Sequence, residues 1–217
     1  MRKQKNQQRR TSLLRNYFGQ TRNPEGALGK MMLRGMNSGH AKLSDWGMTL
    51  LPEVPVERAV DLGCGAGGNI AELVMRYPGA QVMGIDHSEL SVKTSRKANG
   101  KMIRKGLVDI QTGDVSSLNL PDDTFDLATA FETIYFWPGL EECFTEVARI
   151  LKKGGTFLIV NESDGTDKSS QYFQSIIDGM SLYTEEDITE ALKSAGFSDV
   201  QCTHHKKKPW ITVLATK

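Results

Sequence analysis

The pattern that most constrains the fold is a regular alternation of strand-like and helix-like segments after Pro52. Short runs suited to strands lie at residues 57–62, 81–85, 108–112, 125–130 and 156–160. Helix-like segments stand between them at residues 69–77, 88–105 and 140–151. Strands and helices in alternation are the signature of a parallel sheet with helices on both faces. The sequence therefore predicts an α/β fold.

The end of the chain departs from this alternation. Thr184-Glu-Glu-Asp187 resembles a capping box for a helix that runs to about Ser194. Two strand-like runs follow at residues 198–203 and 210–216, and only six residues separate them. A parallel connection needs about a dozen residues or more, so this one is too short for a crossover helix. We therefore predict that the last two strands are antiparallel neighbours.

The region before Pro52 has a different character. Residues 1–12 are polar and basic, and we predict a flexible arm there. Residues 13–51 mix glycines with apolar side chains, a pattern too apolar for a linker and too broken for one long helix. We expect short helices that lie on the rest of the protein. The predicted organisation is a basic arm at 1–12, a helical lid at 13–55 and the main domain at 56–217.

The length and net charge of the chain exclude some classes of protein. The chain has 217 residues, which suits one domain rather than two cores joined by a linker. Its 27 Lys and Arg residues nearly balance 26 Asp and Glu residues, so no field of one sign attracts the whole protein to nucleic acid or to a membrane. Residues 1–10 hold five of the basic residues, which leaves 22 against 26 and a net charge of −4 for residues 11–217.

The cysteines and the apolar segments indicate the cellular compartment in which the protein is expected. Cys64, Cys143 and Cys202 lie far apart, without a Cys-x-x-Cys pair or a His at zinc-finger spacing. The sequence thus predicts neither a disulfide framework nor a metal site. No run of 18 apolar residues occurs, and no apolar stretch of a secretory signal follows the basic start. We expect a cytoplasmic protein without a membrane span.

Residues 61–68, Asp-Leu-Gly-Cys-Gly-Ala-Gly-Gly, are the most informative segment for function. Glycines between a strand and a helix permit a tight turn with positive φ and let a ligand approach the main chain without meeting a Cβ atom. Gly63, Gly65 and Gly68 also fit the dinucleotide fingerprint G-x-G-x-x-G. Asp86 ends the next strand, where a carboxylate can accept both hydrogen bonds of a ribose diol. A dinucleotide or another adenosine-type ligand would satisfy this pattern.

Three features distinguish between these two kinds of ligand. An acid, Asp61, stands just ahead of the first glycine, which is unusual for a nicotinamide site. A third strand end supplies Asp114 and Val115. Their carboxylate and backbone N–H can bind the amino group and a ring nitrogen of adenine. The predicted antiparallel end of the sheet is the third feature.

With these motifs in this order, the sequence resembles the class I S-adenosylmethionine-dependent methyltransferases, in the branch that includes quinone-biosynthesis and other small-molecule enzymes. The resemblance runs from about Val56 to Lys217. It rests on residues 60–68, 84–86, 113–115, 125–126, 130–132 and 149–155 and on the terminal hairpin. It implies a Rossmann-like, doubly wound sheet of seven strands in the order 3-2-1-4-5-7-6, with strand 7 antiparallel. It also implies S-adenosylmethionine as cofactor and S-adenosylhomocysteine as product.

The resemblance implies roles for individual residues as well. Gly63 and Gly65 would pass under the methionine part of the cofactor. Asp61 would orient the turn or meet the methionine ammonium, directly or through water. Asp86 would hold the ribose hydroxyls, and His87 would lie against the adenine. Asp114 and Val115 would bind the adenine edge, and Phe131 and Glu132 would border the sulfonium. The implied cofactor-binding residues are Asp61, Gly63, Cys64, Gly65, Asp86, His87, Asp114, Val115, Phe131 and Glu132.

Methyl transfer from a sulfonium is an in-line displacement, so the main task of the protein is to align the reactants. A general base is needed only where the acceptor must lose a proton. The candidates for a catalytic role are Glu132, His40 and Tyr17, and a purely structural role is the alternative for each. Tyr135 and Trp137 are predicted to shape the acceptor pocket, with packing in the core as the alternative.

The predicted function is methyl transfer to a small-molecule acceptor, and three alternatives stay open. An NAD(P)-dependent reductase has the same glycine motif, and a non-catalytic S-adenosylmethionine-binding protein has the same pocket. An RNA methyltransferase is the third, because residues 1–10 are basic. Nucleic acid is nevertheless disfavoured, since Phe-Glu-Thr-Ile-Tyr at 131–135 replaces the Asn/Asp-Pro-Pro-Phe/Tyr signature of amino-methylating enzymes. The sequence leaves open whether the protein is a monomer or a homodimer.

Overall fold

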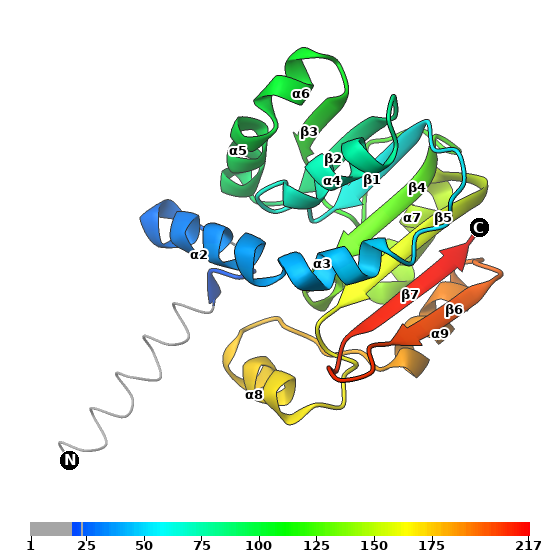
Figure 1. Cartoon of the computed structure of the whole chain (residues 1–217). Coiled ribbons are helices and arrows are strands. Elements are labelled where there is room, and N and C mark those ends of the chain that lie inside the picture. Colours follow the sequence, from blue (N-terminus) through cyan, green and yellow to red (C-terminus); the bar gives the residue numbers. More distant parts are fainter. Residues whose placement is uncertain (1–18, 23) are drawn as a thin grey trace.

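One seven-stranded sheet forms the centre of the computed structural model, which describes residues 19–22 and 24–217 (Figure 1). The predicted basic arm at 1–12 and the candidate Tyr17 lie outside the described residues. The strands are β1 (Arg58–Leu62), β2 (Gln81–Asp86), β3 (Val108–Thr112), β4 (Phe125–Phe131), β5 (Leu151–Asn161), β6 (Val200–His204) and β7 (Ile211–Thr216).

The strand order is β3-β2-β1-β4-β5-β7-β6. Strands β1 to β5 pair in parallel, whereas β7 is antiparallel to both β5 and β6. The predicted Rossmann-like fold and its antiparallel end are therefore confirmed. Because β1 to β5 are parallel, their carboxyl ends meet at one edge of the sheet. The strand order reverses between β1 and β4, and ligand crevices form at such switch points.

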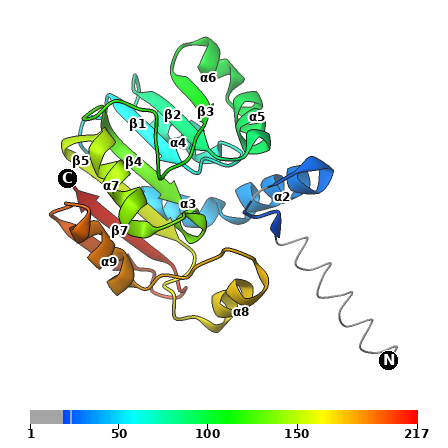
Figure 2. The same ribbon diagram turned by 180° about the vertical axis from the view of Figure 1, so that it is seen from behind.

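Helices cover both faces of the sheet (Figures 1 and 2). Helices α7 and α9 pack on one face through residues such as Phe144 and Leu192, and α3 and α4 pack on the other through Leu43 and Ile70. The view in Figure 2 brings α7 and α9 to the front. The helices are α2 (Gly26–Gly39), α3 (Ala41–Met48), α4 (Gly68–Arg76), α5 (Glu89–Ala98), α6 (Gly100–Arg104), α7 (Leu140–Ile150), α8 (Lys168–Ile176) and α9 (Glu185–Ser194), with the 3-10 helix η1 (Ile134–Phe136).

The region predicted as a lid contains two helices with different surroundings. Helix α3 packs directly on the sheet: Leu43 belongs to the core, and a Cβ atom at Gly47 would lie 2.4 Å from Cγ2 of Val160. Helix α2 instead extends past the sheet and contacts α5 (Figure 1). Helix α3 is thus part of the main body. A lid role for the rest of residues 13–55 stays a prediction.

Two local features differ from the sequence-based expectation. The helix expected over residues 88–105 is divided at Asn99 into α5 and α6. The buried Asn99 amide donates hydrogen bonds to the carbonyl oxygens of Gly67 and Ser95, at 3.0 and 3.1 Å, and so joins the end of α5 to the glycine turn. Helix α8 was not expected either, because it buries Ile176 alone among its nine residues and so lacks an apolar period.

Candidate active site

A cavity of about 410 Å³ lies at the carboxyl ends of the parallel strands, a volume typical of sites for small ligands. Its walls come from the glycine turn between β1 and α4, from the ends of β2, β3 and β4, and from α2 and α3. The predicted cofactor-binding residues that line it are Gly63, Cys64, Gly65, Asp86, His87, Asp114, Val115, Phe131 and Glu132. The remaining one, Asp61, is buried in β1. The fold thus brings this dispersed set to one cavity.

The glycine turn gives the cavity a wall of bare main chain. Gly63, Gly65 and Gly67 have φ angles of 79°, 52° and 81°, in the region that favours glycine. A Cβ atom at Gly63 would lie 2.0 Å from Oγ1 of Thr133, and one at Gly67 would lie 2.1 Å from Oγ of Ser95. At Gly65, by contrast, nothing lies within 4 Å of such an atom. Gly65 is therefore the point where a ligand can approach the backbone closely.

Asp86 holds the turn and the start of α5 in one arrangement. Its Oδ2 accepts a hydrogen bond from the backbone N–H of Gly65, and its Oδ1 accepts one from that of Ser88, each at 2.9 Å. A carboxylate offers about four acceptor positions, so Asp86 retains lone pairs for hydroxyl groups of a ligand. Its contact with a ribose diol stays a prediction.

Asp61 is a buried carboxyl group with an incomplete set of partners. Its Oδ1 accepts a hydrogen bond from the Thr129 hydroxyl at 2.8 Å. Its Oδ2 is buried and has no hydrogen-bond partner within the described part of the chain. Burial raises the pKa of Asp61 to about 7, the Thr129 hydrogen bond opposes this rise, and the Asp86 carboxylate adds to it. An ammonium group or a water molecule is the partner that such an oxygen lacks.

Substituting Asp61 with asparagine is expected to remove the loss of folding stability that the buried carboxyl group causes as the pH rises. A carboxyl group whose pKa rises on folding, here from 3.8 to about 7, contributes stability below pH 4 that is lost as the pH rises through 7. Because one pKa unit corresponds to about 1.4 kcal/mol, Asp61→Asn should gain on the order of a few kcal/mol relative to wild type between pH 4 and pH 8. Urea unfolding of both proteins at several pH values measures this gain.

Asp126→Asn is the control of opposite sign. Hydrogen bonds from Lys152 and from the backbone N–H groups of Arg58 and Glu57 outweigh partial burial and lower the pKa of Asp126. The Asp126 carboxylate therefore contributes to folding stability above pH 4, and this contribution is lost in more acidic solution. The change in unfolding free energy caused by Asp126→Asn should thus stay constant from pH 5 to pH 8. A constant difference for Asp61→Asn over the same range would contradict the prediction.

The ends of β2 and β3 bring together the residues predicted to bind adenine. Oδ1 of Asp114 accepts hydrogen bonds from the backbone N–H and the hydroxyl of Ser116, at 2.9 and 2.8 Å, which orient the carboxyl group. Val115 is buried, whereas the side chain of His87 is half-exposed, with Nδ1 3.8 Å from Oδ1 of Asp86. All three predicted residues line the cavity. Their contacts with adenine stay predictions.

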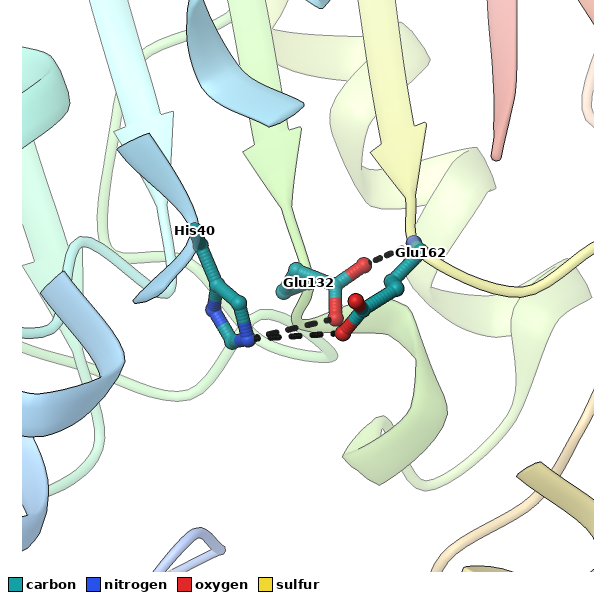
Figure 3. Close-up of side chains that lie close together, drawn as sticks. All are labelled: His40, Glu132 and Glu162. Atoms are coloured by element: carbon teal, nitrogen blue, oxygen red, sulfur yellow. Dashed lines mark hydrogen bonds and ion pairs between the residues drawn. The ribbon is translucent and has the colours of Figure 1, made fainter. Parts of the chain in front are cut away.

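A second group of side chains meets where β4 and β5 end: His40, Glu132 and Glu162 (Figure 3). His40 is the residue between α2 and α3, and its backbone N–H and carbonyl bond to Met36 and Ser44 of these helices. Its Nε2 lies 4.0 Å from Oε2 of Glu132 and 3.7 Å from Oε2 of Glu162. Two of the predicted catalytic candidates, from opposite parts of the chain, therefore share one site.

The conformation and environment of Glu132 are unusual. Its φ angle of 57° lies in the left-handed region, which costs a residue with a Cβ atom about 1–3 kcal/mol. Oε1 accepts hydrogen bonds from the backbone N–H of Glu162 and from the Tyr135 hydroxyl. Burial raises the pKa of Glu132 to about 8 against these hydrogen bonds, and the Glu162 carboxylate adds to the rise. Backbone strain of this kind clusters at functional sites.

Burial acts on His40 in the opposite direction. It lowers the pKa of the imidazole below its ordinary value of 6.5, and the Glu162 carboxylate opposes this change. The neutral imidazole is thus favoured near pH 7, with one ring nitrogen able to accept a proton or bind a cation.

The two aromatic residues predicted to shape an acceptor pocket have different positions. Trp137 lines the cavity, together with Phe136, whereas Tyr135 is not among the residues that line it. Tyr135 is buried: its hydroxyl donates to Oε1 of Glu132 at 3.3 Å and accepts from the backbone N–H of Ser163 at 3.1 Å. Tyr135 therefore fixes the position of Glu132, and its part in binding an acceptor stays a prediction.

Several residues of the site were not found from the sequence. Glu162 directly follows β5, and ligand crevices of parallel sheets lie at such strand ends, so a strand prediction that ran two residues further would have found it. Leu33 and Met36 of α2 and Thr133 also line the cavity. No sequence signal pointed to Leu33 and Met36, because the packing of α2 decides which of its side chains reach the cavity. Thr133 lies just after β4, so the same strand-end rule would have found it.

Known proteins resemble this chain in sequence and in structure. Residues 60–159 match the family described as "Methyltransferase domain". Sterol 24-C-methyltransferase of Yarrowia lipolytica is 28% identical over 175 residues, which cover 74% of this chain and 45% of the relative. The chloroplastic 2-methyl-6-phytyl-1,4-hydroquinone methyltransferase 2 of Oryza sativa is 33% identical over 66% of this chain and 40% of the relative. The chain thus spans less than half the length of these relatives.

The structural comparison gives the same fold. The crystal structure of a methyltransferase from Mesorhizobium loti, described as S-adenosylmethionine-dependent, superposes with a TM-score of 0.66 at 21% sequence identity. The match covers 80% of this chain and 98% of that one.

Proposed function

Because the chain belongs to the class I S-adenosylmethionine-dependent methyltransferases, we propose that it transfers a methyl group from S-adenosylmethionine to a small-molecule acceptor. The observation that carries the proposal is the continuity of the cavity. One cavity is lined by the bare backbone at Gly65, by Asp86 and Asp114 at strand ends, and by His40 and Glu132. An extended ligand on the glycine turn would thus place its reactive end near ionisable groups.

The chemistry needs alignment above all. The acceptor atom forms a bond to the methyl carbon while the sulfur–carbon bond breaks, and the bonding electron pair stays on sulfur, which becomes a neutral thioether. Holding both reactants in line can contribute about 7–11 kcal/mol to catalysis. We propose that Gly63, Gly65, Asp61 and Asp86 hold the methionine and ribose parts. Asp114, Val115 and His87 would surround the adenine, and Phe131 and Glu132 would border the sulfonium.

The acceptor is proposed to be small and to enter beside Trp137, close to Glu132 and His40, which we propose as catalytic residues. Both curated relatives are named as methyltransferases of small molecules, a sterol and a hydroquinone, which supports this class of acceptor. The absence of the amino-methylating signature at residues 131–135 argues against nucleic acid as the substrate.

We also propose a cytoplasmic location. Cys64, Cys143 and Cys202 are all unpaired in the described chain, as is usual in a reducing compartment. As a separate finding, none of the helices in the described ranges is both long enough and apolar enough to cross a bilayer.

Titration calorimetry with S-adenosylhomocysteine and with NADH tests the proposal. We expect S-adenosylhomocysteine to bind in the micromolar range and NADH to give no saturable heat. The two ligands share only their adenosine part, and we propose that the rest of the pocket holds the methionine part. Binding of NADH alone would identify a reductase instead. Methyl-labelled S-adenosylmethionine with a fractionated metabolite extract then tests turnover. Firm binding without any labelled product would favour the non-catalytic alternative.

A further inference from the structure

His40, Glu132 and Glu162 have the chemistry of a metal-ligand set. The three come from the junction of α2 and α3, from the end of β4 and from the end of β5, and their side chains point toward one another (Figure 3). One imidazole nitrogen and two carboxylate oxygens lie within 4.8 Å of one another. No sequence motif indicated a metal site, because these residues are far apart along the chain.

The spacing of these atoms is too large for direct hydrogen bonds. Nε2 of His40 lies 3.7 and 4.0 Å from the two Oε2 atoms, whereas N–H···O hydrogen bonds span about 2.7–3.2 Å. Within residues 19–22 and 24–217, the His40 imidazole makes no hydrogen bond, although its two helices hold its backbone. The three atoms thus surround a position that none of them fills.

The distances suit an ion at that position. Bonds from zinc to nitrogen and to carboxylate oxygen measure about 2.0–2.2 Å, so two ligands of one tetrahedral ion lie about 3.4 Å apart. Atoms separated by 3.7 and 4.0 Å would need only small side-chain movements to reach one ion. The half-exposed Glu162 has the freedom to make such a movement.

The charges of the two carboxyl groups also favour a bound cation. Two carboxyl groups face each other here, and in the described part of the chain neither forms an ion pair with a lysine or an arginine. Like charges at such a distance need either a shared proton or a cation between them. His40 and Glu132 also line the cavity, so an ion between them would have coordination positions open to a bound molecule.

We propose that Nε2 of His40, Oε2 of Glu132 and Oε2 of Glu162 bind one divalent transition-metal ion, such as Mn²⁺ or Zn²⁺. One imidazole with two carboxylates suits such ions better than Mg²⁺ or Ca²⁺, which take oxygen ligands. The open coordination positions would take oxygen atoms of the methyl acceptor, and this second part rests on the proposed function. The acceptor class would be a small molecule with a hydroxyl or enol group beside a second oxygen.

For such an acceptor the steps balance without a further reactant. The hydroxyl group loses its proton to water when its oxygen binds the metal, because a metal ion lowers the pKa of a bound hydroxyl. The oxygen then forms its bond to the methyl carbon as the sulfur–carbon bond breaks, and the products are a methyl ether and S-adenosylhomocysteine.

Metal binding is measured directly on the full chain after treatment with a chelator. Mn²⁺ titration followed by electron paramagnetic resonance, and Zn²⁺ titration by calorimetry, should each give one site per chain in the micromolar range. His40→Gln and Glu162→Gln should each lower the affinity for the metal ion by about 10–100-fold or more, because each removes one of three ligands. Thermal unfolding of each variant by circular dichroism checks that the fold is kept.

The chain offers a matched control pair. His204 and Glu185 also form a histidine–glutamate pair, at 2.7 Å, on an exposed part of β6 and α9. His204→Gln and Glu185→Gln should leave the affinity for the metal unchanged. Three results would overturn the proposal: no binding by wild type, unchanged binding by His40→Gln and Glu162→Gln, or an equal loss in the control variants.

A parallel titration with S-adenosylhomocysteine separates the two proposals. Cofactor binding without metal binding would reject the metal site and leave the proposed function intact. Metal binding without cofactor binding would reject the proposed function and keep the ion site. With both ligands bound, a catechol probe should shift the visible spectrum of the Co²⁺-substituted wild-type protein, and an unchanged spectrum would reject the acceptor class.

Discussion

Replacing Gly65 with alanine is expected to weaken the binding of S-adenosylhomocysteine by about tenfold or more, a loss that corresponds to at least about 1.4 kcal/mol. Gly65 lines the cavity, and an added methyl group would meet no protein atom within 4 Å. The methyl group would therefore occupy space that the proposed cofactor needs, without a clash in the free protein. Titration calorimetry with wild type and Gly65→Ala measures the change.

Gly106→Ala provides the matched control. Gly106 also has a positive φ angle, 72° against 52° for Gly65, and a Cβ atom there also meets nothing within 4 Å. Both substitutions should thus cost about 1–2 kcal/mol of folding stability, because left-handed backbone disfavours residues with a Cβ atom. Gly106 is not among the residues that line the cavity, so Gly106→Ala should bind the ligand normally. Equal affinity of the two variants would show that the cofactor does not lie on the glycine turn.

Replacing Glu132 with glutamine is expected to lower the rate of methyl transfer about a hundredfold or more, the range for loss of an ionisable catalytic group. The amide has nearly the same shape, and its oxygen can still accept hydrogen bonds from Tyr135 and from the backbone of Glu162. The fold and the affinity for S-adenosylhomocysteine should therefore change little. What the variant loses is a group that can gain and release a proton, and the second carboxyl oxygen, which faces His40.

The measurement is transfer of labelled methyl groups to the acceptor fraction found in the turnover experiment. Glu141→Gln is a suitable control, because Glu141 is an exposed acid in the first turn of α7 and is not part of the cavity. It should transfer methyl groups at the wild-type rate. Full turnover by Glu132→Gln would remove Glu132 from the catalytic candidates and leave it a structural role at the end of β4.

Local sequence signals predicted much of the fold. The apolar strands, the glycine turn and the short link before β7 have patterns that are visible within short stretches of the chain. The observed strands fall within two residues of the expected ones, except that β5 begins at Leu151, five residues earlier than expected. The larger errors have a tertiary cause. The break at Asn99 depends on a hydrogen bond to the Gly67 carbonyl, and the extent of the cavity wall depends on where α2 packs.

The amino-acid sequence alone determined the parallel sheet, its antiparallel end and the set of acids at the ends of β2, β3 and β4. These follow from periodicity, from connection lengths and from the rule that parallel strands end at one edge. Only the tertiary structure decided that His40 meets Glu132 and that Glu162 joins them, because α3 must first pack on the sheet to carry His40 there. Contacts between distant residues depend on how whole helices and strands pack, and no local sequence pattern predicts that packing.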